Sequence, residues 1–597
     1  MMRRPTEITD TNGALVRGVA EWIPVKMPNP VFDSSPEAMA YIRRNKGKGH
    51  WCHNFLGIPY ASAPTGAARW STPTVASALP QDPFDATSYR RIAMQTTGPS
   101  RERNLGSRAP DFDEGSVFEW DELGVYESED CALLHVRSPR PVNGANMPVR
   151  VSLHDGGNTE NPAILPRFQG DRLTRFGVLS VEVEYPQSTW GFFTHPDFGG
   201  SHQANMTYQY MLAALEWVQD NIAEFGGDPS RVTLDGASAG GAAGTLLMPQ
   251  GGTLFHRVIA HSGNGVGARL PLARAQGRGR DFWDRLIKDK PAYHAPTRTI
   301  ATIAAEDGIA AALRLGPTPE IIQGYANARR EWTYTEAGPR SDQFKSDNYF
   351  PILDGVIIQN ANSIREITAG RWPLSVQWMG SWAFNEASVI DNANAIDSPN
   401  EYLANIGINS AADQATALSL MGIGGEDRAP RVAYGLCVYG YGVYRVCKDF
   451  SDLGGTAFYV NADYDSLGTG RTRMGHAHIQ QYFIDKPGWQ LAQAVRENTL
   501  QSYHADVSLS EWCAQSMANF MASGDPNEPH PSQVLDDPLF AESAFHRFDA
   551  WEAFDAGDGY RCNMIGNAYD GSGQGAMSVT DGHERLFFEY ADTKAWF

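Results

Sequence analysis

The sequence predicts an α/β fold in which a large, mostly parallel central sheet is covered by helices on both faces. Short apolar runs recur along the chain, and helical patterns such as Tyr208–Glu224 lie between them. The runs are Met147–Leu153, Gly177–Val183, Arg231–Leu234, Arg257–His261, Leu374–Met379 and Thr456–Ala462. Apolar runs of this length are typical of strands that are buried on both sides. One of the runs leads into a glycine-rich turn, which is the most informative feature of the chain.

The segments outside this alternation predict an N-terminal sheet and several insertions. Residues 1–60 are expected to form a small sheet, interrupted by a helical stretch at Ser35–Arg44. The expected insertions are residues 25–50, 88–127, 265–350 and 390–450. The second of them is polar at first and then aromatic, with Phe112, Phe118, Trp120 and Tyr126.

Composition excludes some classes of function. The chain of 597 residues has a formal net charge of −20, which argues against binding to nucleic acid phosphates. Its sequence has no run of about 18 apolar residues, so we expect no membrane span. The segment Met1–Asp10 carries two arginines with no apolar stretch behind them, which is not the pattern of a secretory leader.

A candidate nucleophile lies in the glycine-rich turn. The apolar strand Val232–Leu234 leads into Gly236-Ala237-Ser238-Ala239-Gly240, and a helix of small residues follows. This is the G-x-S-x-G pattern at a strand–turn–helix junction, which exposes a serine hydroxyl at the top of a sheet. The next backbone N–H, that of Ala239, is then placed to donate to an oxyanion. The competing explanation is a helix that is merely capped by serine.

Other motifs surround this turn in a fixed order. They are Phe55–Ala61 with Arg69-Trp70, Ser128–His135, Leu215–Pro229, Leu254–Gly263 and Ala518–Asn527. Together with the serine turn they resemble the type-B carboxylesterase/cholinesterase family of α/β-hydrolases, from about residue 55 to residue 530. The resemblance implies the α/β-hydrolase fold, with residues 1–597 as a single domain whose helical cap insertions shape a substrate gorge. It implies an ester-hydrolysing enzyme that needs neither cofactor nor metal.

The acid of the triad is expected to follow a strand later in the chain, because α/β-hydrolases have the order serine, acid, histidine. The run Leu374–Met379 leads to Asn385-Glu386-Ala387-Ser388, which is similar to the family's Asp-Glu-Gly-Ser, with Glu386 as the acid. One extra residue and Ala387 depart from the pattern. The rivals, more typical of turn residues, are Asp354, Asp463 and Asp465.

Two histidines compete for the role of the base. Counting from Gly475 by the family's Gly-x-x-His pattern selects His478, whereas counting back from the aromatic Tyr482 selects His476. The first register is preferred, with His476 as the alternative base. Two histidines at i and i+2 could also suggest a metal site, but no cluster of cysteine, histidine and carboxylate accompanies them.

The oxyanion hole is expected in the turn after Met147–Leu153. There the sequence His154-Asp155-Gly156-Gly157-Asn158 is similar to the family's His-Gly-Gly-Gly, so that Gly156 and Gly157 would donate together with Ala239. Asp155 departs from the pattern, and its carboxylate would oppose an oxyanion unless it points away.

Further departures concern substrate and compartment. The family's glutamate before the nucleophile is replaced by Ala237, which argues against a specialist for cationic choline esters. The family's disulfide partner for Cys131 is missing, since no cysteine lies between Cys52 and Cys131, and this favours a reducing, cytoplasmic location.

The sequence therefore predicts a serine carboxylic-ester hydrolase that acts on a small molecule through an acyl-enzyme. One alternative is the same triad used on a lactone or an amide, or for acyl transfer. Another is a non-catalytic binding protein on the same scaffold. The oligomeric state is left open.

Overall fold

The computed structural model of the chain describes residues 2–25, 34–95, 125–199, 204–266, 269–289, 294–295, 298–319, 321–322, 351–383, 386, 399–400, 403, 408–421, 433, 435–463, 476, 478–485, 504–528, 551, 553–554, 562–567 and 575–580. Within these ranges thirteen strands form one sheet, in the order β1-β2-β3-β7-β9-β8-β10-β11-β16-β17-β18-β19, with β4 paired to β2. Neighbouring strands are parallel from β9 through to β18 and antiparallel at both ends of the sheet.

The strands of this sheet are β1 Arg3–Thr9, β2 Leu15–Pro24, β3 Gly49–Pro59, β4 Phe84–Asp85, β7 Leu133–Ser138, β8 Met147–Leu153, β9 Leu179–Val183, β10 Gly227–Ala237, β11 Arg257–His261, β16 Gln377–Ala383, β17 Ala457–Asp463, β18 Cys562–Asn567 and β19 Gly575–Thr580. Three small pairs lie outside it: β5 Arg91–Ala93 with β6 Tyr126–Ser128, β12 Leu270–Pro271 with β15 Ile352–Leu353, and β13 His294–Ala295 with β14 Arg298–Thr299.

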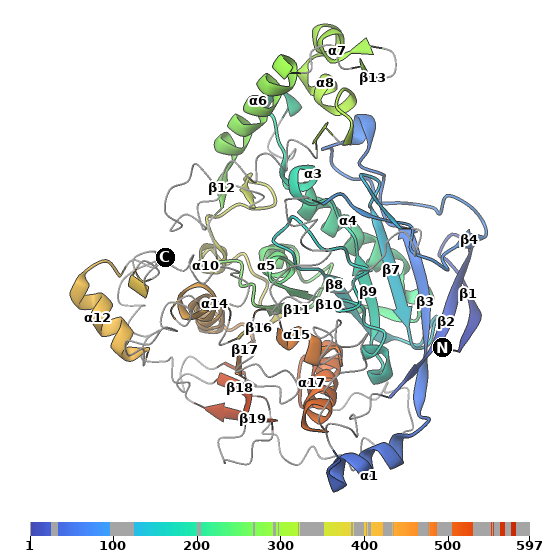
Figure 1. Ribbon diagram of the computed structural model, residues 1–597, viewed down its shortest axis with the longest axis vertical. Helices are drawn as coiled ribbons and strands as arrows, with labels where there is room; N and C mark the ends of the chain where they lie inside the picture. Colours follow the sequence, from blue (N-terminus) through green and yellow to red (C-terminus); the bar gives the residue numbers. More distant parts are fainter. Residues whose placement is uncertain are drawn as a thin grey trace.

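Within the described residues, the α-helices are α1 Pro36–Asn45, α3 Ser188–Phe192, α4 Met206–Asn221, α5 Ala239–Leu246, α6 Leu272–Asp289, α7 Ile300–Asp307, α8 Ile309–Leu315, α10 Ser363–Thr368, α12 Ala411–Leu420, α14 Tyr441–Asp452, α15 His478–Phe483 and α17 His504–Ser523. Figure 1 shows α4 and α5 on one side of the central strands and α15 and α17 on the other. Among the described residues, no helix is long and apolar enough to cross a membrane. This layering is the predicted α/β architecture.

Most predicted strands coincide with observed ones, and one prediction needs correction. The run Leu374–Met379 predicts a strand three residues too early, since β16 is Gln377–Ala383. The N–H of Val376 donates to the carbonyl of Pro373 in a turn, and the side chain of Leu374 is exposed, so the strand begins only after this turn. The helical stretch predicted at Ser35–Arg44 is α1, which Ser35 caps by accepting from the N–H of Ala38.

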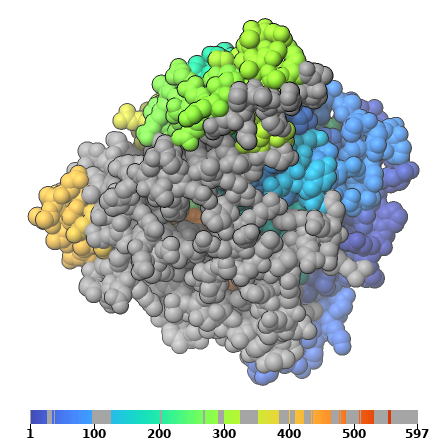
Figure 2. Space-filling model, turned by 45° about the horizontal axis from the view of Figure 1, so that its top comes forward, coloured from blue at the N-terminus to red at the C-terminus, as the bar shows by residue number. Residues whose placement is uncertain are grey.

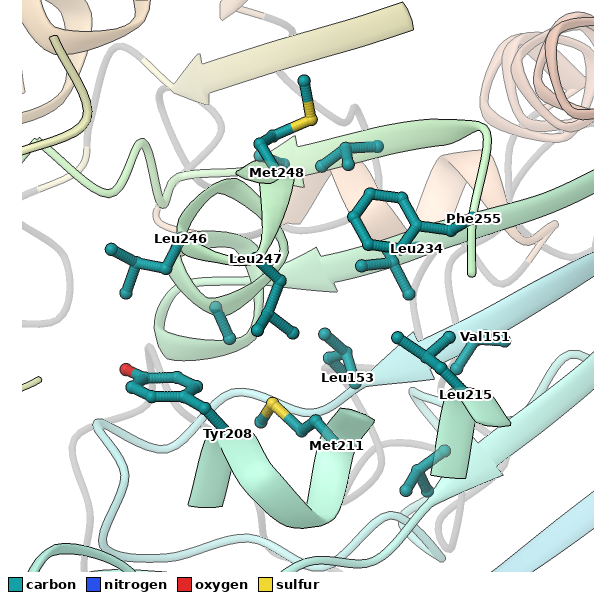
Figure 3. Close-up of a cluster of buried hydrophobic side chains, with 14 of the residues drawn as sticks. Val151, Leu153, Tyr208, Met211, Leu215, Leu234, Leu246, Leu247, Met248 and Phe255 are labelled. Carbon is teal, nitrogen blue, oxygen red and sulfur yellow. The ribbon is translucent and has the colours of Figure 1, made fainter. Parts of the chain in front are cut away.

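The two faces of the parallel strands differ in chemistry. Towards α4 and α5 the strands present apolar residues that pack into one large cluster. Figure 3 shows Val151 and Leu153 of β8 and Leu234 of β10 directed towards Tyr208 and Met211 of α4 and the end of α5. On the opposite face, β8 and β10 present buried polar residues, among them Arg150 and Asp235, whereas β11, β16 and β17 also contribute apolar residues such as Ile259, Met379 and Val460 to a second cluster with α15 and α17. The predicted runs on β8 and β10 are therefore apolar on one face only, whereas those on β11, β16 and β17 have apolar residues on both faces.

The predicted insertions that the structure describes lie on different sides of the molecule, with α1 of the insertion at 25–50 at the bottom of Figure 1. The helices α6, α7 and α8, from the insertion at 265–350, extend away from the sheet in Figure 1 and form the upper edge of the molecule in Figure 2. Of the four aromatic residues named in the expected insertion at 88–127, Phe112, Phe118 and Trp120 lie outside the described residues, and Tyr126 is exposed. The single domain predicted for residues 1–597 stays a prediction.

Candidate active site

The serine of the G-x-S-x-G motif occupies a strained turn between β10 and α5. Ser238 has φ 52° and ψ −119°, a conformation that L residues rarely adopt. Its N–H donates to the carbonyl of His261 at 2.7 Å, and its own carbonyl accepts from Ala242 at 2.9 Å in the first turn of α5. The side chain of Ser238 is partly exposed at the end of the sheet. This is the turn that the motif predicts.

Small residues are required around this turn because backbone segments cross it closely. A Cβ atom built on Gly240 would lie 2.1 Å from the carbonyl oxygen of Leu153 and 2.6 Å from that of His154. Both distances are far below a van der Waals contact. The first turn of α5 therefore lies directly against the end of β8, where the predicted oxyanion segment begins.

The predicted acid binds a histidine. Glu386 is completely buried, and its Oε2 lies 2.5 Å from Nδ1 of His476. An ionised carboxylate can only accept, so Nδ1 carries the proton and donates, and Nε2 is the basic nitrogen of the neutral ring. The other carboxylate oxygen, Oε1, accepts from the N–H of Ala383 and from the hydroxyl of Ser262, each at 2.7 Å. The carboxylate is thus held on both oxygens.

This pairing bears on the choice between the two histidines. His478 is the first residue of helix α15, and its side chain lies outside the described residues. His476 precedes the helix, is buried, and has its ring edge-to-face with Tyr439 at a centroid distance of 5.2 Å. The register counted from Tyr482 therefore selects a histidine that contacts Glu386.

The candidate oxyanion segment is held in a fixed shape. Gly156 has φ +110°, and a Cβ atom there would lie 1.9 Å from the carbonyl oxygen of Glu160, so only glycine fits. Gly157 follows with φ +60°. The ring of Tyr185 stacks on His154 at 4.2 Å, and its hydroxyl donates to the His154 carbonyl at 2.9 Å. Burial lowers the pKa of His154 to about 4, so this ring carries no charge near neutral pH.

The unexpected carboxylate of Asp155 is neutralised within the segment. Its Oδ1 accepts from Nδ2 of Asn161 at 2.7 Å and pairs with the guanidinium of Arg167 at 2.8 Å. Nearby, the buried carboxylate of Glu184 accepts from the N–H of Ala163 at 2.5 Å, and burial raises the pKa of Glu184 to about 8. The predicted conflict between Asp155 and an oxyanion is thus avoided by a local ion pair.

Sequence reasoning missed several residues that contact or lie beneath these candidate residues. Ser262 binds Glu386 through its side chain, and Asp235 and His261 lie in the strands directly beneath the serine turn. A signal for Asp235 was present, since it is an acidic residue inside an apolar strand, three positions before Ser238. Within the described ranges, no three histidine, cysteine or acidic side chains gather as a metal site. The five described cysteines are free and buried, Cys52 and Cys131 among them.

Comparison with known proteins identifies several to which this chain is similar. The model of the carboxylesterase family matches residues 42–286. Over 225 residues the chain is 36% identical to fumonisin B1 esterase of Sphingopyxis macrogoltabida, covering 37% of each chain. It is 35% identical over 217 residues to liver carboxylesterase B-1 of Rattus norvegicus, covering 35% of this chain and 36% of the relative. The matched segment thus spans little more than a third of either relative.

A solved structure is similar over nearly the whole length. The structure of a PNB esterase matches with a TM-score of 0.68 and 18% sequence identity, covering 98% of this chain and 99% of the other. At this identity the likeness shows the fold alone. The predicted α/β-hydrolase fold is confirmed.

Proposed function

We propose, from the match of residues 42–286 to the model of the carboxylesterase family, that this protein is a serine carboxylic-ester hydrolase. The observation that carries the proposal is the buried contact between Glu386 and His476 next to the strained Ser238 turn. The two parts are joined through neighbouring residues, because the His261 carbonyl accepts from the N–H of Ser238 and the Ser262 hydroxyl donates to Glu386. A nucleophile, a base and an orienting acid are the parts that acyl transfer needs.

The proposed reaction has two halves. In the first, the Ser238 hydroxyl oxygen attacks the ester carbonyl carbon, and His476 Nε2 takes the hydroxyl proton. The C–O bond to the alcohol then breaks, and His476 returns the proton to the departing alcohol. In the second half, water attacks the acyl-enzyme, His476 takes a proton from it, and the carboxylic acid leaves as Ser238 regains its proton.

The charges that form during these steps have partners in the proposal. Glu386 stabilises the imidazolium of His476 and fixes its tautomer. The backbone N–H groups of Gly156, Gly157 and Ala239 are proposed to donate to the oxyanion, where each donor is typically worth about 3 kcal/mol. The packing of α5 against the end of β8, which brings the two halves of this hole together, supports the assignment.

A small neutral or anionic ester is the proposed substrate class. Ala237 stands next to the nucleophile and carries no charge that would attract a cationic alcohol. Asp155, the acidic group of the oxyanion segment, is already paired with Arg167. The proposal names no particular acid or alcohol.

Covalent labelling tests the proposal. A fluorophosphonate should label the wild type once, at Ser238, and the Ser238→Ala variant should fold normally, remain unlabelled and lose ester hydrolysis by several orders of magnitude. Ser523→Ala, which changes a serine at the end of α17, is the matched control and should label like the wild type. Hydrolysis of a p-nitrophenyl ester by Ser238→Ala within tenfold of the wild type would end the proposal. A wild type that is neither labelled nor active would favour the binding protein.

A further inference from the structure

Four neighbouring strands each place one buried polar side chain in a continuous row beneath the serine turn. The row consists of Arg150 on β8, Asp235 on β10, His261 on β11 and Ser381 on β16. All four side chains are fully or almost fully buried. Strand register places them on one face of the sheet, since His261 pairs with Ala237 and with Ser381, and Arg150 pairs with Thr233.

The ring of His261 is the centre of this row. Its Nε2 lies 3.1 Å from Oδ1 of Asp235, and its Nδ1 lies 2.8 Å from the hydroxyl oxygen of Ser381. Since an ionised Asp235 only accepts, Nε2 donates to it, and Nδ1 of the neutral ring accepts from the Ser381 hydroxyl. The ring also packs edge-to-face on Phe483, at a centroid distance of 4.8 Å.

Each of these three contacts is made to a strand or helix that lies next to one member of the proposed triad in the sequence. Asp235 lies on β10, three residues before Ser238. Ser381 lies on β16, from which the chain runs to Glu386. Phe483 lies on α15, which begins two residues after His476.

The backbone of the same segment touches the triad as well. The His261 carbonyl accepts from the N–H of Ser238 at 2.7 Å. The following residue, Ser262, donates through its hydroxyl to Glu386, and its N–H donates to the carbonyl of Ser381. One residue and its neighbour therefore contact the turn of the nucleophile, the acid and the strand that leads to the acid.

We propose that His261 is a positioning residue, whose ring fixes the strand of Ser238, the strand that leads to Glu386 and the helix after His476 in one relative geometry. This inference rests on the proposed hydrolase function. It goes beyond that function because it assigns a role to a second histidine, one that acts through its contacts with Asp235, Ser381 and Phe483.

The charge balance of the row keeps this arrangement rigid. Burial would raise the pKa of Asp235, but the charge of Arg150 and the bond from His261 outweigh it and lower that pKa to about 2. The carboxylate therefore stays ionised and remains an acceptor for both partners at neutral pH. Arg150 is further held by the carbonyl of Phe168 at 2.8 Å. A fixed anion beneath the turn gives the His261 ring a single orientation.

The test replaces the ring and separates packing from hydrogen bonding. His261→Phe keeps an aromatic ring against Phe483 but loses both hydrogen bonds, and His261→Gln restores an N–H donor for Asp235. The control His50→Phe removes a buried histidine on β3 whose Nε2 lies 2.8 Å from the Thr174 hydroxyl oxygen, with β7, β9 and β8 between it and β10. For each variant, kcat and KM on p-nitrophenyl butyrate, the rate of fluorophosphonate labelling and the melting temperature are measured.

Positioning predicts a particular pattern of results. His261→Phe should lower kcat and the labelling rate together, by about 10- to 100-fold, with KM within about threefold, because small displacements of reacting groups have effects of this size. His261→Gln should recover part of the loss. His50→Phe should lose stability to a similar extent and keep kcat.

Two results would overturn the inference: a kcat of His261→Phe within threefold of the wild type, or an equal loss of kcat in His50→Phe. If His261→Phe does not fold, Ser381→Ala and His261→Gln decide by the same criteria, because each leaves most of the row in place. A wild type that is neither labelled nor active would instead remove the proposed function, and the inference with it.

Discussion

Neighbouring residues of a single central strand point to opposite faces of the sheet, and the two faces differ in chemistry. On β10, Leu234 points into the apolar cluster between the sheet and α4 and α5 (Figure 3). The next residue, Asp235, points to the opposite face and pairs with Arg150 and His261. Both residues are fully or nearly fully buried. The apolar face needs only volume and shape, whereas the polar face needs specified partners at specified distances.

This difference indicates that the two faces contribute to the protein in different ways. Burial of apolar surface is non-directional and stabilises the fold as a whole. Hydrogen bonds and ion pairs are directional, so the polar face sets where the strands end relative to one another. The proposed nucleophile and acid follow directly after two of these strands.

The largest expected effect on kcat is that of Glu386→Gln, which changes the acid of the proposed triad. A neutral amide cannot stabilise the imidazolium of His476 and can select the wrong tautomer, so kcat should fall by roughly 10³- to 10⁴-fold. Substrate binding should change little. Steady-state kinetics on a p-nitrophenyl ester measures both. The comparison Asp463→Asn alters a rival acid, and a large loss there with a silent Glu386→Gln would refute the assignment.

On the apolar face, Leu234→Ala should affect stability and leave catalysis intact. Removing a fully buried leucine side chain typically costs about 3–5 kcal/mol through lost burial and the cavity that remains. Urea denaturation should show this loss to the same extent at every pH at which the protein is folded. A kcat that differs from the wild type by more than about threefold would show that the two faces are not separable.

On the polar face, the contribution of Asp235 to stability should depend on pH. Its pKa in the folded protein is lowered to about 2, mainly because Arg150 and His261 outweigh the effect of burial. A lowered pKa means that the stabilisation is fully present above the unfolded value, near 4, and is lost as the pH falls through about 2. A shift of this size corresponds to about 2 kcal/mol.

The variant Asp235→Asn isolates the contribution of the ionised carboxylate to stability. The difference in unfolding free energy between the wild type and Asp235→Asn, measured in urea, should be largest above about pH 5 and should shrink towards pH 3. A difference that is constant over this range would mean that the carboxylate is not held ionised by its partners.

The local features of the site could be predicted from sequence, because they depend on a few consecutive residues. The strained turn at Ser238 follows from a strand, two flanking glycines and a helix of small residues. The fold class follows from apolar runs separated by helical patterns. Both are seen in the structure, although β16 begins after the turn at Pro373 rather than before it.

The remaining features depend on contacts between distant segments. His476 and His478 are equivalent in spacing arguments, and only the fold shows which of them reaches Glu386, 90 positions earlier in the chain. Asp155 looks unfavourable in the sequence because its partner Arg167 is brought to it by the fold. Likewise, the partners of Asp235 lie on two other strands, so the sequence alone could not predict what this acidic residue contacts.

The most direct test of the central claim compares the two histidines. The central claim is that the polar face positions a triad of Ser238, Glu386 and His476. Measured as kcat/KM on p-nitrophenyl butyrate, His476→Ala should lose at least about 10³-fold, as expected when a triad base is removed. His478→Ala should stay within about tenfold of the wild type. If His478→Ala abolishes turnover while His476→Ala retains it, the pairing of Glu386 with His476 is not the catalytic one, and the account is contradicted.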